Sequence, residues 1–178
     1  AQGYAGLTSI LNKLSITTVR QTYVALRSSS LPTSVLTASL SSALCSYDGQ
    51  SSAQKATSTV HFAYALAALS CAMWERTGAS LAEAAWARLE GCLLGGNGGG
   101  GGGGAPAAAG CRAHNALTFL ATCYLGKRLS LAFVLDVVEA CVDCDSEEVG
   151  LGLASYALDL VGLRACKEAG EDERRVVE

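Results

Sequence analysis

Two pairs of residues have the types and the spacing of metal ligands. Cys111 and His114 are separated by two residues, and so are Cys141 and Cys144. Zinc takes thiolate and imidazole ligands in a tetrahedron, and a gap of two residues lets each pair converge on one ion. However, Cys141 lies on the apolar stripe of its helix, and Cys111 adjoins a glycine tract. We interpret these cysteines as core and helix-end residues, and a four-ligand zinc site is the weaker alternative.

The residues used in catalysis have no recognisable arrangement in the sequence. The two histidines are His61, inside a strongly apolar segment, and His114. We expect His61 to be a hydrogen-bonded core residue rather than a base, and no Ser or Cys adjoins a His in a nucleophile motif. The Cys141-x-x-Cys144 pair lacks the strand-then-helix setting of redox motifs. The sequence therefore predicts no catalytic residues, no cofactor and no small-molecule substrate, and the chain is not expected to be an enzyme.

Apolar residues recur at helical spacing along nearly the whole chain. Leu7, Ile10, Leu11 and Leu14 stand at positions i, i+3, i+4 and i+7, which places them on one face of a helix. No segment shows the sustained alternation of a strand. We predict an all-α fold of eight helices paired as antiparallel hairpins, each with an apolar face that only a neighbouring hairpin can cover. This is the logic of an α-solenoid.

Local signals predict where several helices begin and which faces are buried. Residues 53–76 are apolar on most sides and predict a central helix. Ser80 with Glu83, and Asp145 with Glu148, have the spacing of capping boxes. Ser130 is expected to begin the seventh helix, and residues 168–178 form a charged tail, expected to be a short or frayed helix. The inward residues predicted for the seventh helix are Leu131, Val134, Leu135, Val138 and Val142.

One segment, residues 95–110, is of low complexity and rich in glycine. A phosphate-binding loop needs a strand before the glycines and Lys-Ser/Thr after them, and both are missing here. We therefore expect a flexible loop inserted between two helices of a single domain that spans residues 1–178. The chain begins with Ala1 rather than Met, so we expect it to be a fragment of a larger protein.

The charge of the chain is polarised along its length. Residues 1–128 carry nine Lys/Arg and four Asp/Glu, whereas residues 129–178 carry four and twelve. The first 47 residues contain Lys13, Arg20 and Arg27 and no acid, which predicts a basic edge for RNA or an acidic partner. A net charge of −3 is far from that of a dedicated nucleic-acid binder. No membrane partner is expected, because the longest near-apolar run, residues 60–74, is shorter than the ~20 residues that a bilayer needs.

Three segments are similar to a known family of helical domains. They are GLTSILNKLS at residues 6–15, HNALTFLATCYLGKRLSLAFVLDVVEAC at residues 114–141, and Gly162-Leu163-Arg164. Through them the chain resembles the middle domain of eukaryotic initiation factor 4G, and within that family the nucleolar branch that works in small-subunit ribosome biogenesis. The resemblance covers residues 6 to about 166. It implies a HEAT-type domain of five hairpins, with an armadillo-like superhelix.

The resemblance also implies a function. Members bind DEAD-box RNA helicases of the initiation-factor 4A class, so we expect a non-catalytic scaffold that binds such a helicase, and RNA, during rRNA processing in the nucleolus. Carried over by position, Asn12, Lys13 and Leu14 are the helicase-binding candidates. The residues alone favour a core position for Leu14 and a helix surface for Asn12. The alternative function is an RNA-binding or protein-interaction domain in translation initiation, splicing or mRNA decay, with a cytoplasmic location.

Overall fold

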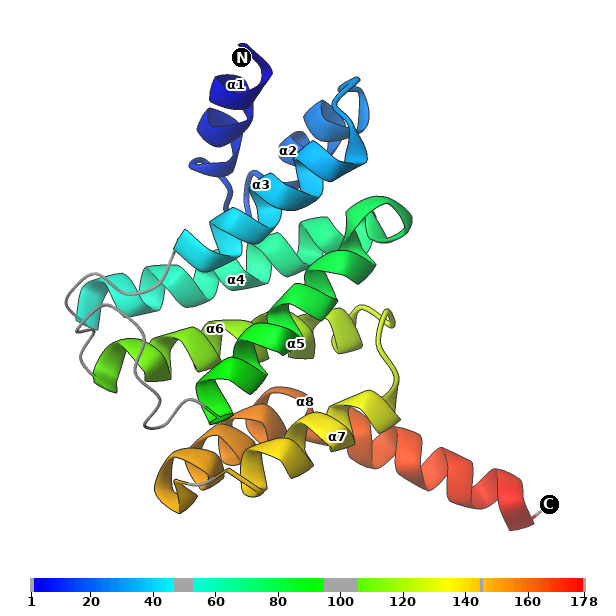
Figure 1. Ribbon diagram of the computed structural model, residues 1–178. Helices are drawn as coiled ribbons and strands as arrows, with labels where there is room; N and C mark the ends of the chain where they lie inside the picture. Colours follow the sequence, from blue (N-terminus) through cyan, green and yellow to red (C-terminus); the bar gives the residue numbers. More distant parts are fainter. Residues whose placement is uncertain (1, 47–52, 95–105, 145, 178) are drawn as a thin grey trace.

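The computed structural model describes residues 2–46, 53–94, 106–144 and 146–177, and within these ranges the fold is all-α, as predicted. Figure 1 shows the helices in chain order from one end of the molecule to the other, so that the two termini lie far apart. The α-helices are α1 (Gln2–Leu11), α2 (Val19–Arg27), α3 (Thr33–Ser46), α4 (Ala53–Ala72), α5 (Ala79–Leu94), α6 (Pro106–Leu125), α7 (Leu131–Val142) and α8 (Glu147–Val177). A π-helical turn, η1 (Trp74–Gly78), joins α4 to α5.

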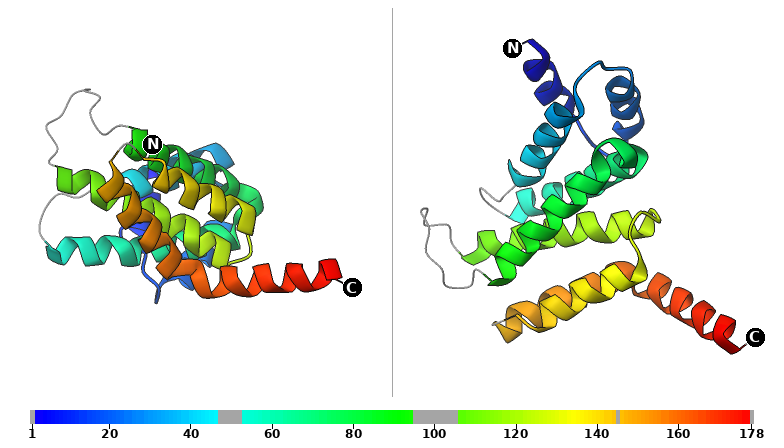
Figure 2. Two further views of the ribbon diagram at one scale, coloured as in Figure 1. Left: turned by 90° about the horizontal axis from the view of Figure 1, so that it is seen from below. Right: turned by 45° about the vertical axis from the view of Figure 1, so that its right-hand side comes forward.

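The helices contact one another in an alternating order. Helix α3 lies between α1 and α5, and α5 also contacts α7, while the even-numbered helices α2, α4, α6 and α8 contact one another in sequence. Some neighbours in the chain also pack together, most extensively α5 with α6 and α7 with α8. The right-hand view of Figure 2 shows the same succession of layers, and in both of its views the C-terminal part of α8 projects away from the other helices.

The core is built around α4 and α6. Leu66 and Leu69 on α4, and Leu117 and Phe119 on α6, have at most 1% of their surface exposed. Burying one such side chain contributes roughly 1.5–3 kcal/mol relative to leaving it in water. The main cluster of buried side chains continues from Leu7 on α1 to α8, so one apolar interior runs through all the layers.

The ends of several helices differ from the sequence prediction. Ser130 begins α7 as predicted, and its hydroxyl accepts a hydrogen bond of 3.2 Å from the Phe133 amide. The predicted capping box at Ser80 is wrong, because η1 leads directly into α5 at Ala79 and Ser80 lies inside the helix. Helix α4 ends at Ala72, and the residues that follow form the π-helical turn. The other predicted box begins at Asp145, which lies outside the described residues.

The start of α6 corrects the predicted extent of the glycine-rich loop. Pro106 occupies the first position of the helix, so residues 106–110 are helical rather than part of the loop. Proline suits this position because its missing amide hydrogen would have had no partner within the helix. Residues 95–105, which hold the rest of the predicted loop, lie outside the described residues.

The seventh helix is rotated relative to the prediction. Its buried residues are Val134, Val137 and Cys141, whereas Leu135 and Val142 are 53% and 50% exposed. The error has a physical reason: α7 is packed mainly against α8, at one end of the molecule, so its apolar face is wider than the surface that its neighbours cover.

The eighth helix is continuous through the charged tail. It extends to Val177, so residues 168–177, for which a short or frayed helix was expected, are the last turns of α8. Leu153, Ala154, Ala157 and Val161 form its buried face. Its segment 147–170 is the one helix in the described ranges that is long and apolar enough to cross a bilayer, with a mean hydropathy of 1.3 and 28% of the segment buried. This segment is not the near-apolar run of residues 60–74 noted in the sequence, and the absence of a membrane partner stays a prediction.

A polar cluster fastens α8 to the end of α6. The Glu168 carboxylate accepts hydrogen bonds of 2.8 Å from the Tyr124 hydroxyl and from Arg164 Nε. Arg164 also donates through Nη1 to the Leu125 carbonyl at 2.6 Å and lies over the Tyr124 ring, 5.0 Å from its centroid. The hydrogen bonds from Arg164 and Tyr124 lower the pKa of Glu168, and burial followed by the Glu168 contact raises that of Tyr124.

Candidate functional site

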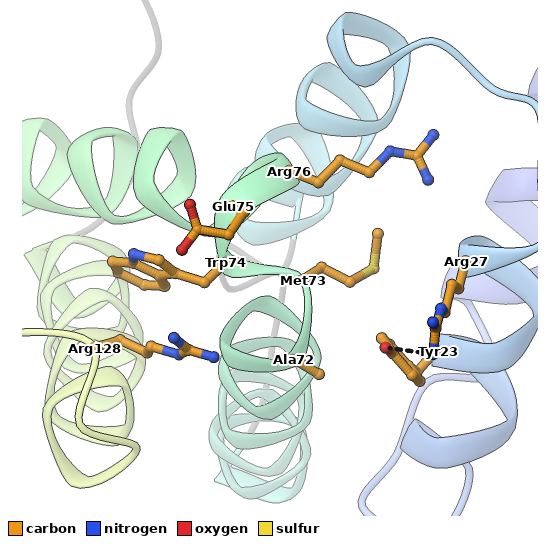
Figure 3. Close-up of a pocket in the computed structure, with 8 residues that line it drawn as sticks. All are labelled: Tyr23, Arg27, Ala72, Met73, Trp74, Glu75, Arg76 and Arg128. Atoms are coloured by element: carbon orange, nitrogen blue, oxygen red, sulfur yellow. Dashed lines mark hydrogen bonds between the residues drawn. The ribbon is translucent and has the colours of Figure 1, made fainter.

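An arginine-rich pocket lies at the C-terminal end of α4 and is bounded by α2 and by the connection from α6 to α7 (Figure 3). We call it the α4-end pocket. Its cavity volume is about 220 Å³, below the roughly 300–1,000 Å³ of sites for drug-sized ligands. It has room for a small planar or anionic group rather than a large cofactor. The lining residues are Tyr23, Arg27, Ala72, Met73, Trp74, Glu75, Arg76 and Arg128.

One side of the pocket is a face of α2. Arg20, Tyr23 and Arg27 stand at i, i+3 and i+7, which places them along the same face of the helix. Arg27 donates through Nη1 to the Tyr23 hydroxyl at 3.5 Å, so the guanidinium and the ring are held together. Arg20 and Arg27 are both exposed, and about 10.5 Å of helix separates them at 1.5 Å per residue. The α2 side therefore combines one aromatic ring with two cations that face solvent.

The opposite side is positioned by the end of α6. The Arg128 amide donates to the Cys123 carbonyl at 2.9 Å, and the Lys127 amide donates to Tyr124 at 2.8 Å. This is the hydrogen-bond pattern of a Schellman turn, with Lys127 at φ 60° in the left-handed position that usually holds glycine. The turn places Arg128 at the end of α4, where its Nε donates a hydrogen bond to the Cys71 carbonyl at 3.1 Å. The terminal amino groups of Arg128 extend toward Ala72 in Figure 3.

The floor and one wall come from the π-helical turn that follows α4. Such turns are rare and are often found at functional sites. Trp74 begins η1 and is half-buried, and Met73 beside it is buried. Gly78 ends η1 in close contact with the Trp74 ring, where a Cβ atom would lie 2.6 Å from ring atom Cε3. The close packing of the turn therefore fixes the orientation of the indole.

Arg76 joins the π-helical turn to the end of α2 and to the segment before α3. Its guanidinium donates through Nη1 to the Leu26 carbonyl at 3.2 Å and through Nη2 to the Leu31 carbonyl. These carbonyls lie at and after the end of α2, where main-chain acceptors lack partners within the helix. A cation also interacts favourably with the negative end of the helix dipole. Arg76 therefore acts as a structural clamp, and Arg27 and Arg128 are the cations that face the pocket.

Two thiols lie directly behind Arg128. A hydrogen bond from Cys123 lowers the pKa of Cys71, and the nearby Arg128 charge lowers it further, against the effect of burial. The pKa of Cys123 is raised by the same hydrogen bond and by burial. Gly126 allows this approach, because a Cβ there would lie 2.8 Å from the Cys71 sulfur. The Cys71 thiol therefore loses its proton more readily than the Cys123 thiol.

The chemistry of the pocket is that of binding. Two guanidinium groups can each form paired hydrogen bonds with a phosphate or carboxylate. Tyr23 and Trp74 offer flat apolar faces, and Glu75 is the one acidic side chain among the lining residues. These lining residues are therefore suited to hold an anionic, planar ligand.

The structure places the predicted basic and helicase-binding residues in different settings. Arg27 lines the pocket and Arg20 shares its face of α2, while Lys13 is exposed in the turn between α1 and α2. Asn12 is also exposed. Leu14 has 6% of its surface exposed and belongs to the core cluster, which fits its interpretation as a core residue and leaves it no surface for a partner.

The turn after α1 is held by its own hydroxyl groups. The Thr18 hydroxyl donates to the Lys13 carbonyl at 2.7 Å and accepts from the Ser15 amide at 2.9 Å. Ser15 and Thr18 also exchange a hydrogen bond between their hydroxyls at 3.0 Å. This local network fixes the main chain at Lys13, so the exposed side chains of Asn12 and Lys13 project from an ordered turn.

Three of the four residues of the weaker zinc hypothesis have described side chains, and each of these three packs against other residues. The His114 ring packs edge-on against Tyr156 with centroids 4.7 Å apart, and the Cys144 thiol donates to the Leu93 carbonyl at 3.5 Å. Cys141 is fully buried, and burial raises its pKa to about 11, which disfavours the thiolate that zinc requires. The Cys111 side chain lies outside the described residues. No three His, Cys, Asp or Glu residues in the described part of the chain could hold a metal together.

The sequence prediction for His61 is wrong. His61 was expected in the core, but it is exposed on α4. Among the other residues that line the pocket, Tyr23, Trp74 and Arg128 were not predicted to be site residues from the sequence. The spacing of Arg20, Tyr23 and Arg27 was the one signal available, because it already gives a mixed basic and aromatic helix face.

Comparison with known proteins adds no relative. The chain matches no protein-family model, and the searches of curated proteins and of solved structures found no significant match.

Proposed function

We propose that this chain is a non-catalytic helical scaffold of the type found in the middle domain of initiation factor 4G. It binds a DEAD-box RNA helicase of the initiation-factor 4A class and serves in small-subunit rRNA processing in the nucleolus. The proposal joins the resemblance of residues 6–15 and 114–141 to the arrangement of the helices. The chain performs no reaction itself and acts by holding the helicase in a productive orientation.

The observation that carries the proposal is the alternating contact order of the helices. In an α-solenoid each hairpin packs on the next, so first helices contact first helices and second helices contact second helices. The contacts of α1 with α3, α3 with α5, and α2 with α4 follow this order, and so do those of α4 with α6 and α6 with α8. This supports a HEAT-type superhelix, whose elongated surface suits a large partner better than a small ligand.

The first turn is the proposed helicase-docking site. Asn12 and Lys13 are exposed and lie on a turn that Thr18 fixes, so binding would lose little conformational entropy there. The segment also carries no acidic residue, so Lys13 keeps an uncompensated charge for an acidic surface of the helicase.

The test uses a purified helicase of this class, the chain as it is, and two charge reversals. Lys13→Glu removes the proposed contact, and Lys167→Glu, on exposed α8 at the other end of the molecule, is the matched control. We expect the chain to bind the helicase and to raise its RNA-dependent ATPase rate. Lys13→Glu should weaken binding by about tenfold, because like charges then meet at the interface.

Two results would contradict the proposal. If the unaltered chain neither binds nor stimulates helicases of this class, the scaffold function is wrong. If Lys13→Glu and Lys167→Glu have equal effects, the docking site lies elsewhere on the molecule. Circular dichroism is the control for folding. Both variants should keep their helices, because both lysines are exposed.

A further inference from the structure

We propose that the α4-end pocket binds single-stranded RNA directly, one base entering the cavity while Arg27 and Arg128 bind the phosphates on either side of it. The sequence predicted only a basic edge for RNA or an acidic partner; this proposal places an RNA contact in the pocket that Arg27 lines, away from the Asn12–Lys13 turn. The inference rests on the side chains that meet at the pocket and does not require a helicase.

Two cations lie on either side of the α4 end. Figure 3 shows Arg27 on one side of the α4 end and Arg128 on the other, with Met73 and Ala72 between them. A strand laid across the end of α4 therefore meets a cation on each side. Arg20 continues the basic face along α2, away from the pocket. Guanidinium groups suit this role because their fork of donors matches the geometry of a phosphate.

An aromatic ring lies beside each of these cations. Tyr23 accompanies Arg27 and Trp74 accompanies Arg128 (Figure 3). Proteins that bind single strands combine a basic path with aromatic rings on which bases stack, and stacking is available to every base. An acidic peptide would use the cations but would leave both flat apolar faces without a partner. The pairing of rings with guanidiniums therefore favours RNA over an acidic peptide.

The size of the cavity favours a single strand. A cavity of about 220 Å³ accepts one planar group and excludes a duplex, in which the bases are stacked inside the helix. Single-stranded RNA can splay a base out of the strand, and protein recognition of RNA sequence uses such bases. Met73, which lines the cavity and is 6% exposed, offers an apolar contact to a base inserted there.

The single carboxylate among the lining residues gives the pocket a base preference. Glu75 lies on the same side of the pocket as Trp74 (Figure 3) and is exposed. A carboxylate accepts hydrogen bonds and donates none, so it favours a base with an amino group, such as cytosine, over uracil, which presents a carbonyl at the same position. We therefore expect cytosine-containing strands to bind more tightly than uracil-containing strands of the same length.

The experiment measures the fluorescence anisotropy of labelled oligo(C) and oligo(U) decamers with the full chain and no helicase. Arg27→Gln removes one phosphate contact, and Lys167→Gln, equally exposed on α8, is the matched control. For single strands the logarithm of the binding constant falls with the logarithm of salt concentration by about 0.7 per phosphate contact. We expect Arg27→Gln to reduce that slope by about 0.7, while Lys167→Gln leaves it unchanged.

Two further variants test the base site. Trp74→Leu keeps an apolar side chain on the π-helical turn and should weaken binding by about 5- to 150-fold, the range measured for one stacked base. Glu75→Gln should bring the affinities for oligo(C) and oligo(U) together, because an amide both donates and accepts. Circular dichroism and thermal melts of each variant separate loss of the site from loss of the fold.

The outcomes distinguish this proposal from its competitors and from the proposed function. Equal salt slopes for Arg27→Gln and Lys167→Gln would overturn it. So would unchanged affinity in a folded Trp74→Leu variant, or displacement of RNA by poly-glutamate at equal charge concentration, which would indicate an acidic peptide instead. Helicase binding is read in a separate assay with Lys13→Glu, so either proposal can fail while the other stands.

Discussion

Substituting Gly78 by alanine tests whether the packing of the π-helical turn is as tight as described. A Cβ atom at this position would lie 2.6 Å from the Ser70 carbonyl oxygen and 2.6 Å from Cε3 of Trp74. Each of these two atoms would have to move about 0.8 Å away from the new Cβ atom to reach ordinary van der Waals contact at 3.4 Å. Neither is free to do so, because Ser70 is fully buried within α4 and the indole packs against the core.

The magnitude follows from the cost of overpacking. Inserting a methyl group into a well-packed interior costs typically 1–3 kcal/mol. For a chain of this length each kcal/mol lowers the melting temperature by roughly 2–4 °C. We therefore expect Gly78→Ala to lower the melting temperature by about 2–12 °C. Displacement of the indole should also reduce RNA binding by the α4-end pocket.

Gly162 provides a control of opposite sign. It lies in the interior of α8, and a Cβ there would meet nothing within 4 Å. Replacing an unobstructed helical glycine by alanine stabilises a protein by roughly 0.5–1 kcal/mol, because alanine loses less conformational freedom on folding. Gly162→Ala should therefore raise the melting temperature by about 1–4 °C. Scanning calorimetry of both variants and the unaltered chain measures the two shifts. Equal shifts, or a Gly78→Ala variant as stable as the unaltered chain, would refute the account of the turn.

Three more results follow from contacts near the pocket and the end of α6. Iodoacetamide should alkylate Cys71 well before Cys123 at mild alkaline pH, because the pKa of Cys71 is lowered and that of Cys123 is raised; equal rates in peptide mass spectrometry would contradict this. The pKa of Glu168 is lowered in the folded chain, so the ionised carboxylate stabilises the fold at pH values above the ordinary glutamate pKa of 4.5. This stabilisation is lost as the pH falls through the folded-state pKa. In urea titrations, the difference in unfolding free energy between the unaltered chain and Glu168→Gln should therefore shrink at low pH. Lys127→Gly should raise the free energy of unfolding by up to about 1 kcal/mol, since it relieves a left-handed conformation at the cost of glycine's greater entropy loss. A variant less stable in urea than the unaltered chain would show that Lys127 makes a compensating contact.

The all-α class could be predicted because periodicity is a local property. The spacing of Leu7, Leu11 and Leu14 is readable in one short segment, and all three residues are buried. The phase of α7 could not be predicted in the same way. Leu135 and Val142 are as apolar as the residues that are buried, and their exposure depends on where α7 has neighbours.

The pocket could be predicted only in part, because its two sides come from distant parts of the chain. Arg27 was singled out by the absence of acids around it, but nothing in the sequence indicates that Arg128 lies across the end of α4 from it. The π-helical turn was also missed. Gly78 signals the end of a helix when read locally, and its actual role depends on the contact of Trp74 with the layer behind it.

The turn that ends α6 has a consequence for how the chain can vary. Within four residues it supplies the Leu125 carbonyl to α8 and the Arg128 guanidinium to α4. One residue added to or removed from this turn changes the chain separation between Leu125 and Arg128 by one Cα–Cα step of about 3.8 Å. An insertion or deletion here would therefore detach one neighbouring helix or the other. In natural variants of this chain we therefore expect no insertions or deletions at residues 125–128, even where side chains in this turn differ.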